Sequence, residues 1–305
     1  MSNIPLSAPN IKGNEKKYIN ECLDTEWVSS AGKYVNLFEE KIAGYVGAKF
    51  AVAFVNGTSA LQVSLRLAGV MPNDEVIVPS LTFIAPINSV IYNNAKPIFM
   101  DSDSHYNIDV EKTIDFIKSN TTFKNGSTFN KKTKRKISAI IPVHVWGNAV
   151  DIVDLINICK ERNIKIVEDA SESLGTVYSK GTLNKKHTGT LGLFGCFSFN
   201  GNKIITAGGG GMLVTDNEKL AKEAKYLTTQ AKDDPIRYIH HSIGHNFRLT
   251  NIQAALGVAQ LENLSNFISR KKEIHKKYLD SINQIDGLNI SKTPKYSHNN
   301  YWLNI

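Results

Sequence analysis

The stretch FSFNGNKIITAGGGGML, residues 197–213, places one lysine between a short apolar run and four consecutive glycines. Lys203 can be a phosphate-binding lysine, an exposed charge beside a turn, or a covalent catalyst that forms a Schiff base. A Walker A loop is excluded, because its glycines precede the lysine, whereas here residues 208–211 follow it. The two remaining interpretations depend on which other residues the fold brings to Lys203.

A second segment with possible chemistry, Asn56-Gly57-Thr58-Ser59, lies between an apolar run and a helical pattern. The free N–H groups at a helix N-terminus, together with two hydroxyls, can form a phosphate-binding cradle. Plain N-capping by Thr58 or Ser59 is the alternative. A dinucleotide loop is not predicted, because no G-x-G-x-x-G follows this first strand.

A third segment is the carboxylate pair Glu168-Asp169, which follows the apolar run IKIV. A carboxylate there can cap the next segment, bind a metal, or pair with the protonated ring nitrogen of pyridoxal phosphate (PLP), which keeps that ring an electron sink. No metal site is expected, since the histidines at positions 240, 241 and 245 have no carboxylate at matching spacing. Cradle, carboxylate and lysine occur in that order on one predicted α/β domain, and together they are the groups that PLP needs.

The apolar periodicity predicts alternating strands and helices, and therefore a parallel sheet with helices on both faces. Strands are expected at residues 50–55, 75–78, 97–100, 137–142, 164–168, 194–199 and 211–215. Helices are expected at residues 14–24, 34–46, up to 67, 85–92, 110–118, 152–161, 218–227, 251–261 and 264–283. The polar residues 121–136 are expected to be irregular. Ligands of such sheets bind beyond the carboxyl ends of the strands, where the three segments fall.

A boundary is expected near residue 250. It would divide a large PLP-binding domain, residues 1–250, from a linking helix and the beginning of a small C-terminal domain, residues 251–305. The chain ends in the apolar run NNYWLNI with no cap or polar tail, so we expect the small domain to be truncated.

Composition limits the cellular setting. The sequence contains no run of 18 apolar residues and no apolar segment near its start, so neither membrane insertion nor secretion is expected. Three widely separated cysteines fit a reducing cytoplasm.

The net charge is +8, and part of it lies in KKTKRK, residues 131–136. This run is expected to be a solvated loop rather than a nucleic-acid site, since no aromatic residues interleave with it.

The sequence resembles the DegT/StrS-type sugar-nucleotide aminotransferases, which are PLP-dependent enzymes of fold type I, over nearly all 305 residues. The motifs that carry the resemblance are WVSSAGKYVNLFEE, VNGTSALQVSL, EVIVPSLTFIA, PVHVWG, VEDASESLG, FSFNGNKIITAGGGGM and GHNFRLTNIQAALG. Within the family, FSFNGNK, KHTGTLG and NYWLN are most similar to transaminases of the legionaminic-acid, perosamine and bacillosamine types, which make 4-amino sugars for bacterial surface glycans.

The resemblance implies a role for each matching residue. Lys203 corresponds to the Schiff-base lysine and Asp169 to the carboxylate on the pyridine nitrogen. The phosphate site corresponds to Gly57, Thr58, Ser59 and Ser198. Phe83 corresponds to the aromatic residue stacked on the ring, with an ordinary core phenylalanine as the alternative. Asn246 corresponds to an asparagine that reaches the cofactor phosphate of the neighbouring subunit, which would require a homodimer with a shared active site.

Three positions depart from the common family pattern, and five others are expected near the sugar. Many family members have glutamine where Glu172 stands, and that side chain contacts cofactor or substrate. Asn200 and Gly209 also depart from the common pattern, but the presence of Lys203 favours amination over the dehydration catalysed by members that lack it. Residues that would line the sugar site, with ordinary packing as the alternative, are Trp27, Ser29, Ser30, His144 and Trp146.

The predicted function is transfer of an amino group from L-glutamate to C4 of a nucleotide-linked 4-keto-6-deoxy sugar, derived from UDP-GlcNAc. Two alternatives stay open at this point. The chain could be a PLP-binding regulator or scaffold without turnover, or an inactive truncated chain.

Overall fold

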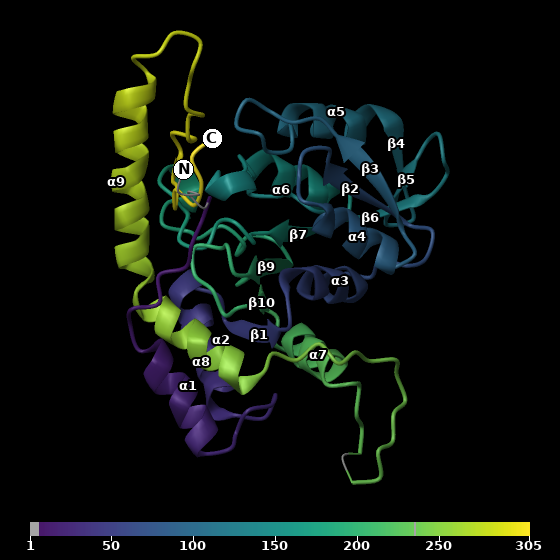
Figure 1. Cartoon of the computed structure of the whole chain (residues 1–305). Coiled ribbons are helices and arrows are strands. Elements are labelled where there is room, and N and C mark those ends of the chain that lie inside the picture. The colour runs from purple at the N-terminus through teal and green to yellow at the C-terminus, as the bar shows by residue number, and fades with distance from the viewer. Residues whose placement is uncertain (1–5, 235) are drawn as a thin grey trace.

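Nine strands form one mixed sheet at the centre of residues 6–234 and 236–305, which are the residues that the computed structural model describes (Figure 1). The strand order is β1-β10-β9-β7-β6-β2-β3, and the hairpin β4–β5 joins this sheet because β5 pairs with β6. Neighbours from β9 to β3 are parallel, whereas β10 is antiparallel to both β9 and β1. The strands are β1 (Phe50–Phe54), β2 (Glu75–Pro79), β3 (Lys96–Met100), β4 (Thr121–Lys124), β5 (Ser127–Asn130), β6 (Lys136–Ile140), β7 (Lys165–Asp169), β9 (Phe194–Ser198) and β10 (Gly211–Thr215).

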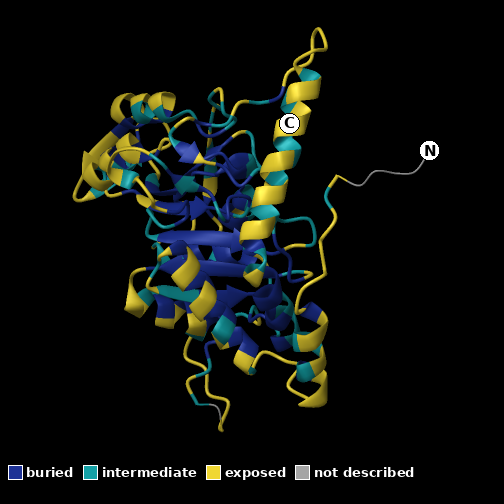
Figure 2. Ribbon diagram, turned by 90° about the vertical axis from the view of Figure 1, so that its left-hand side faces the viewer, coloured by how far each residue is buried: buried dark blue, intermediate teal, exposed yellow. Residues whose placement is uncertain are grey.

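Helices cover both faces of the sheet. Successive side chains of β1 point to opposite faces, so that each face contributes to a separate core cluster. Val52 and Phe54 point to a core cluster built with α3 (Gly57–Leu67), α4 (Ile84–Tyr92) and α7 (Glu218–Thr228). Ala53 points to the opposite cluster, built with α1 (Glu15–Asp24), α2 (Lys33–Val46) and α8 (Asn251–Glu262). Figure 2 shows the buried sheet between these exposed layers.

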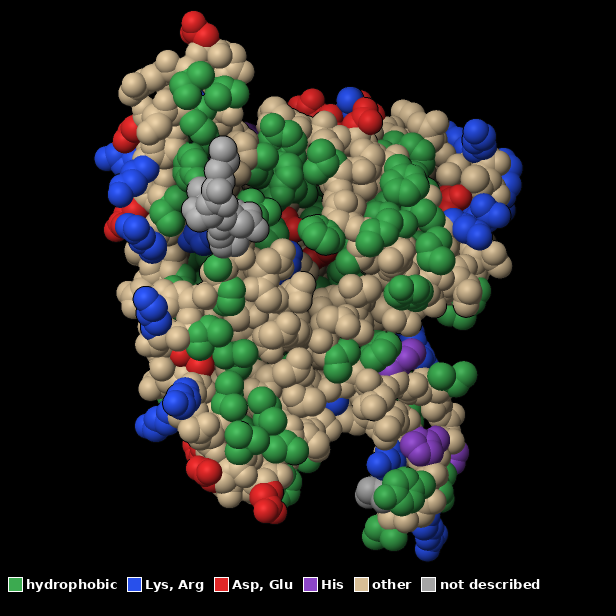
Figure 3. Space-filling view, viewed as in Figure 1, with side chains coloured by type: hydrophobic (Ala, Val, Ile, Leu, Met, Phe, Trp, Pro, Cys, Tyr) green, Lys and Arg blue, Asp and Glu red, His purple; other side chains and the backbone are tan. Residues whose placement is uncertain are grey.

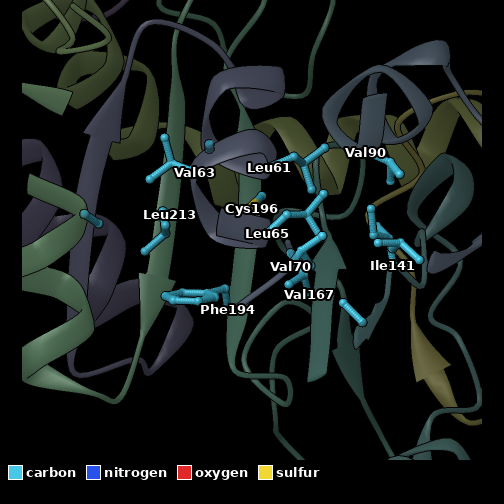
Figure 4. Close-up of a cluster of buried hydrophobic side chains, with 14 of the residues drawn as sticks. Leu61, Val63, Leu65, Val70, Val90, Ile141, Val167, Phe194, Cys196 and Leu213 are labelled. Atoms are coloured by element: carbon cyan, nitrogen blue, oxygen red, sulfur yellow. The ribbon is translucent and has the colours of Figure 1, made fainter. Parts of the chain in front are cut away.

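The first of these clusters lies under α3. Leu61 and Leu65 of this helix pack with Phe194 and Cys196 of β9 and with Leu213 of β10 (Figure 4). A third cluster joins β2, β6 and β7 to α5 (Val110–Asn120) and α6 (Val153–Glu161). The predicted α/β fold with a mostly parallel sheet is therefore confirmed, and every expected strand and helix is present within a few residues of its expected bounds.

The expectation of irregular structure at residues 121–136 was wrong for residues 121–130, whereas residues 131–135 are turn and irregular structure. Residues 121–130 form the hairpin β4–β5, in which Thr121 pairs with Asn130 and Lys124 with Ser127. Its two-residue turn is Asn125-Gly126, and both residues have positive φ, 52° and 71°. This dipeptide is the strongest short-range hairpin signal, because a type I′ turn requires that conformation at both positions.

The C-terminal part of the chain packs against the main sheet domain. Ala254, Ala255 and Val258 of α8 belong to the same core cluster as Phe38 of α2. The long α9 (Leu264–Ile282) follows, and the chain then returns beside it (Figure 1). After this return, β11 (Ser297–His298) pairs with β8 (Val177–Tyr178). A domain division after residue 250 remains a prediction. None of the helices in the described residues is both long and apolar enough to cross a membrane.

Two helical glycines test the packing of α8 on α2. A Cβ at Gly257 in α8 would lie 2.6 Å from Cζ of Phe38, whereas a Cβ at Gly44 in α2 would meet nothing within 4 Å. We expect Gly257→Ala to lower the free energy of unfolding by about 1–3 kcal/mol through overpacking. Gly44→Ala should raise it by up to about 1 kcal/mol through helix propensity. Chemical denaturation measures both, and equal effects of the two variants would contradict this packing.

Candidate active site

A cavity of about 670 Å³ opens at the carboxyl ends of the parallel strands, where the sequence predicts a ligand site. Its walls come from the N-terminus of α3, from the segments after β2, β6, β7 and β9, and from the glycine turn before β10. Its lining includes the predicted site residues Gly57, Thr58, Phe83, Asp169, Glu172, Ser198 and Lys203. Segments up to about 150 residues apart in the chain are thus brought to one cavity.

The N-terminus of α3 forms one wall. Asn56 is the N-cap, and its Oδ1 accepts a hydrogen bond of 2.8 Å from the N–H of Ser59. The helix therefore begins at Gly57 and directs its first N–H groups toward the cavity, beside the hydroxyl-bearing residues Thr58 and Ser198. Glycine fits best at position 57, because a Cβ would lie 3.1 Å from both Ser171 Oγ and Ser198 Cβ, which is closer than ordinary van der Waals contact. Ser59 is buried and is not among the lining residues.

The two carboxylates at the end of β7 have different surroundings, because successive residues of a strand face opposite sides. Asp169 lines the cavity, and its Oδ1 accepts a hydrogen bond of 3.0 Å from the N–H of Ser171. Glu168 is completely buried on the other side. Its carboxylate accepts hydrogen bonds from the N–H groups of Gly189, Leu191 and Gly192 at 2.6–2.8 Å.

His144 is placed differently from the expectation of a substrate contact. Its ring is completely buried, and Nδ1 accepts a hydrogen bond of 3.1 Å from the N–H of Val150. Nε2 therefore carries the ring hydrogen and donates a hydrogen bond of 2.9 Å to Glu168 Oε2. Both ring nitrogens are engaged and the residue does not line the cavity, so the geometry assigns His144 to the support of Glu168 rather than to substrate.

Lys203 follows β9 and lines the cavity. Its Nζ is 3.4 Å from Glu172 Oε1, 4.2 Å from the centroid of the Trp302 ring and 5.3 Å from that of Phe83. Glu172 also accepts a hydrogen bond of 2.7 Å from the N–H of Trp146. Burial raises the pKa of Glu172, although Lys203 and the N–H of Trp146 partly oppose the shift. Lys203 is thus enclosed by a carboxylate and two aromatic rings, and the interpretation as an exposed charge does not fit this structure.

Part of this enclosure comes from the C-terminal segment and was not predicted from the sequence. Trp302 is almost fully buried, and its Nε1–H donates to the carbonyl oxygen of Asn202 at 2.6 Å. The Asn300 side chain donates to the carbonyl oxygens of Glu172 and Leu174 at 2.9 Å. These contacts hold the C-terminal segment against the loops on both sides of Lys203. The motif NYWLN carries part of the family resemblance, but no periodicity predicts that its Trp302 contacts a lysine about 100 residues earlier.

Four other predicted residues lie outside this cavity. Trp27 and Ser30 line a second cavity of about 610 Å³ that also contains Arg248. Ser29 accepts, through its carbonyl oxygen, a hydrogen bond of 2.7 Å from the N–H of Asn251. Asn246 is exposed, at the end of the excursion between α7 and α8 that Figure 1 shows extending away from the sheet. The single chain does not bring these residues to Lys203.

The cavity fits the chemistry of PLP on several counts. It offers a helix N-terminus with hydroxyls for a phosphate, a carboxylate for a ring nitrogen and a lysine for a carbonyl carbon. Two buried lining atoms, Thr82 Oγ1 and Asn202 Oδ1, have no hydrogen-bond partner among the described residues, as expected where a polar ligand completes the site. A mixed sheet with this set of groups around one cavity defines the class of PLP-dependent aminotransferases.

Comparison with known proteins gives the family. Residues 9–305 match the DegT/DnrJ/EryC1/StrS aminotransferase family, and the chain belongs to it. It is 39% identical to the GDP-perosamine synthase of Escherichia coli O157:H7 over 303 residues, which are 99% of this chain and 77% of that protein. It is 40% identical to the GDP-perosamine synthase of Caulobacter vibrioides over 278 residues, 90% of this chain and 69% of that one.

Solved structures agree. A DegT DnrJ EryC1 StrS aminotransferase from Brucella abortus superimposes with a TM-score of 0.84 at 27% identity, over 95% of this chain and 73% of that chain. The resemblance found in the sequence is confirmed, as are the fold type and the cofactor. The chain is a PLP-dependent sugar-nucleotide aminotransferase.

The raised pKa of Glu172 predicts a pH dependence of stability. The folded chain holds the Glu172 proton to higher pH than the unfolded chain, in which the pKa is near the ordinary 4.5. The free energy of unfolding therefore decreases as pH rises from about 4.5 through the folded-state pKa. Glu172→Gln has no titrating carboxyl, so we expect the variant to gain stability relative to the parent as pH rises above about 4.5, measured by denaturation without cofactor.

The matched control is Glu223→Gln on the exposed face of α7. It should follow the parent protein over the same pH range. If the curves of Glu172→Gln and the parent run parallel, the buried carboxylate does not titrate as this environment requires.

Proposed function

We propose that the protein transfers the amino group of L-glutamate to C4 of a nucleotide-linked 4-keto-6-deoxy sugar, through the cavity that contains Lys203. The observation that supports this proposal is the meeting of Lys203, Asp169 and the N-terminus of α3 on the walls of one cavity. The sequence predicts a sugar derived from UDP-GlcNAc. Several relatives at 35–40% identity are named GDP-perosamine synthase, which favours a GDP-linked acceptor instead.

When bound, PLP links covalently to amines and takes up the electron pair left on the substrate carbon. In this proposal, Asp169 holds a proton on the ring nitrogen, and Thr58, Ser198 and the first N–H groups of α3 bind the phosphate. Lys203 Nζ takes the proton from the α-carbon of glutamate, and in the second half-reaction it delivers a proton to C4 of the sugar. Trp302, which is almost fully buried with its ring centroid 4.2 Å from Lys203 Nζ, shields this amine from water.

We also propose that two chains form a homodimer with shared active sites. Asn246 lies outside the cavity of its own chain, on an exposed excursion that also carries the exposed apolar side chains Ile236, Tyr238 and Ile243. An arm of this kind supports contact with a second subunit, where Asn246 would reach the cofactor phosphate. The three cysteines are free and buried, which supports a place in the reducing cytoplasm.

The test is the visible absorption of the purified protein with PLP, before and after addition of L-glutamate. We expect glutamate to remove the visible band, because the amino group moves to the cofactor. Lys203→Ala should lose this response and lower turnover by about 100- to 10,000-fold, while its thermal unfolding stays cooperative. A response to glutamate that persists in Lys203→Ala would refute the assignment. A band that glutamate does not change would favour a scaffold or an inactive chain.

The acceptor is identified in the second half-reaction. The glutamate-treated protein is mixed with GDP-linked or UDP-linked 4-keto-6-deoxy sugars, and the return of the visible band is followed together with the mass of the product. The proposal predicts a band that returns with one of these sugars and a product in which an amine replaces the ketone oxygen.

A further inference from the structure

Almost all of the net charge of this protein lies in one segment. Residues 118–136, which we call the basic hairpin, contain seven Lys and Arg residues and no Asp or Glu, whereas the remainder of the chain has 29 Lys and Arg against 28 Asp and Glu. Six of the seven cations are exposed and Lys136 is half-buried. The cations are Lys118, Lys124, Lys131, Lys132, Lys134, Arg135 and Lys136. A concentration of this kind is unexpected for charges that only keep a surface hydrated.

Hydrogen bonds from neutral side chains, rather than ion pairs of its cations, hold the basic hairpin in place. The Asn130 side chain donates to buried Glu75 at 2.9 Å and accepts from the N–H of Lys132 at 2.9 Å. Thr128 Oγ1 donates to the carbonyl oxygen of Arg162 at 2.6 Å, and the Asn163 side chain donates to that of Gly126 at 2.7 Å. Among the residues that the structure describes, no ion pair involves the cations of the basic hairpin. Their charge is therefore available to a partner.

The basic hairpin lies away from the active site. β5 pairs with Lys136 and Ile137, at the amino end of β6, whereas the cavity opens beyond the carboxyl end of the same strand. Figure 3 shows Lys and Arg side chains gathered at the edge of the molecule where Figure 1 places β4 and β5. The cations are thus not arranged to bind the diphosphate of a nucleotide sugar in the cavity.

We propose that the basic hairpin docks the protein on the anionic headgroups of a phospholipid membrane. Six of its seven cations are lysines, which act as point charges and lack the planar fork with which arginine recognises nucleic acid. Phe123, 44% exposed on β4 next to Lys124, supplies an apolar side chain for the interface. The cations sit on a projecting edge, which fits a flat anionic surface better than the groove that a strand of nucleic acid requires.

The test is sedimentation of the whole chain with lipid vesicles. We expect binding to vesicles that contain phosphatidylglycerol, none to pure phosphatidylcholine, and weaker binding as salt rises above about 0.1 M. The triple variant Lys131→Gln/Lys132→Gln/Lys134→Gln should bind about 100-fold more weakly, from about fivefold per lysine near an anionic surface. Its thermal unfolding and its response to L-glutamate should stay unchanged, because none of the three residues lines the cavity.

The matched control removes the same charge from α9, through Lys272→Gln/Lys276→Gln/Lys277→Gln, three exposed lysines. The control should bind vesicles as the parent protein does. Equal losses in both variants would attribute the binding to net charge alone and overturn the proposal. Absence of vesicle binding would overturn it too, as would binding of the basic hairpin to a single-stranded polynucleotide in place of vesicles.

Discussion

The buried carboxylate of Glu168 joins β7 to two separate segments of the chain. It accepts hydrogen bonds from His144 after β6 and from the N–H groups of Gly189, Leu191 and Gly192 before β9. Burial by itself raises the pKa of this carboxyl, but the hydrogen bonds from His144 and from the backbone outweigh burial, so that the pKa is lowered. A buried carboxylate that is shielded from water is stable only when several hydrogen-bond donors surround it. The segments that supply these donors to Glu168 are therefore held in fixed positions relative to one another.

The positions of the reactive groups follow from this constraint. Asp169 is the next residue along β7 and must face the cavity when Glu168 faces the interior. Three residues after the end of β7, the carboxylate of Glu172 pairs with Lys203. The carbonyl oxygen of Glu172 accepts a hydrogen bond from the Asn300 side chain. The C-terminal segment, which follows α9, thereby covers the lysine with Trp302. One network of buried polar groups thus links the sheet, the site and the end of the chain.

The sequence predicted the sheet, its helices and the cavity residues on α3, β7 and β9, because each depends on local periodicity or on position at a strand end. The hairpin β4–β5 was not predicted, because its polar composition is also typical of an irregular loop. The dipeptide Asn125-Gly126 is the local signal that indicates the hairpin. Contacts across the fold had no local signal. For that reason, Trp302 and Asn300 were not foreseen, and His144, expected at the substrate, instead supports Glu168. Trp27, Ser29 and Asn246 lie outside the cavity of the single chain, and no local pattern in the sequence places them relative to it.

The most direct test of this account is to find which lysine holds the cofactor. Borohydride reduction of the PLP-loaded protein fixes the cofactor permanently to the amine that carries it, and peptide mass spectrometry then locates the added mass. The account predicts the phosphopyridoxyl group on Lys203 alone, in the peptide that follows β9. The same mass on another lysine, or on none, would contradict the assignment of this cavity as the active site.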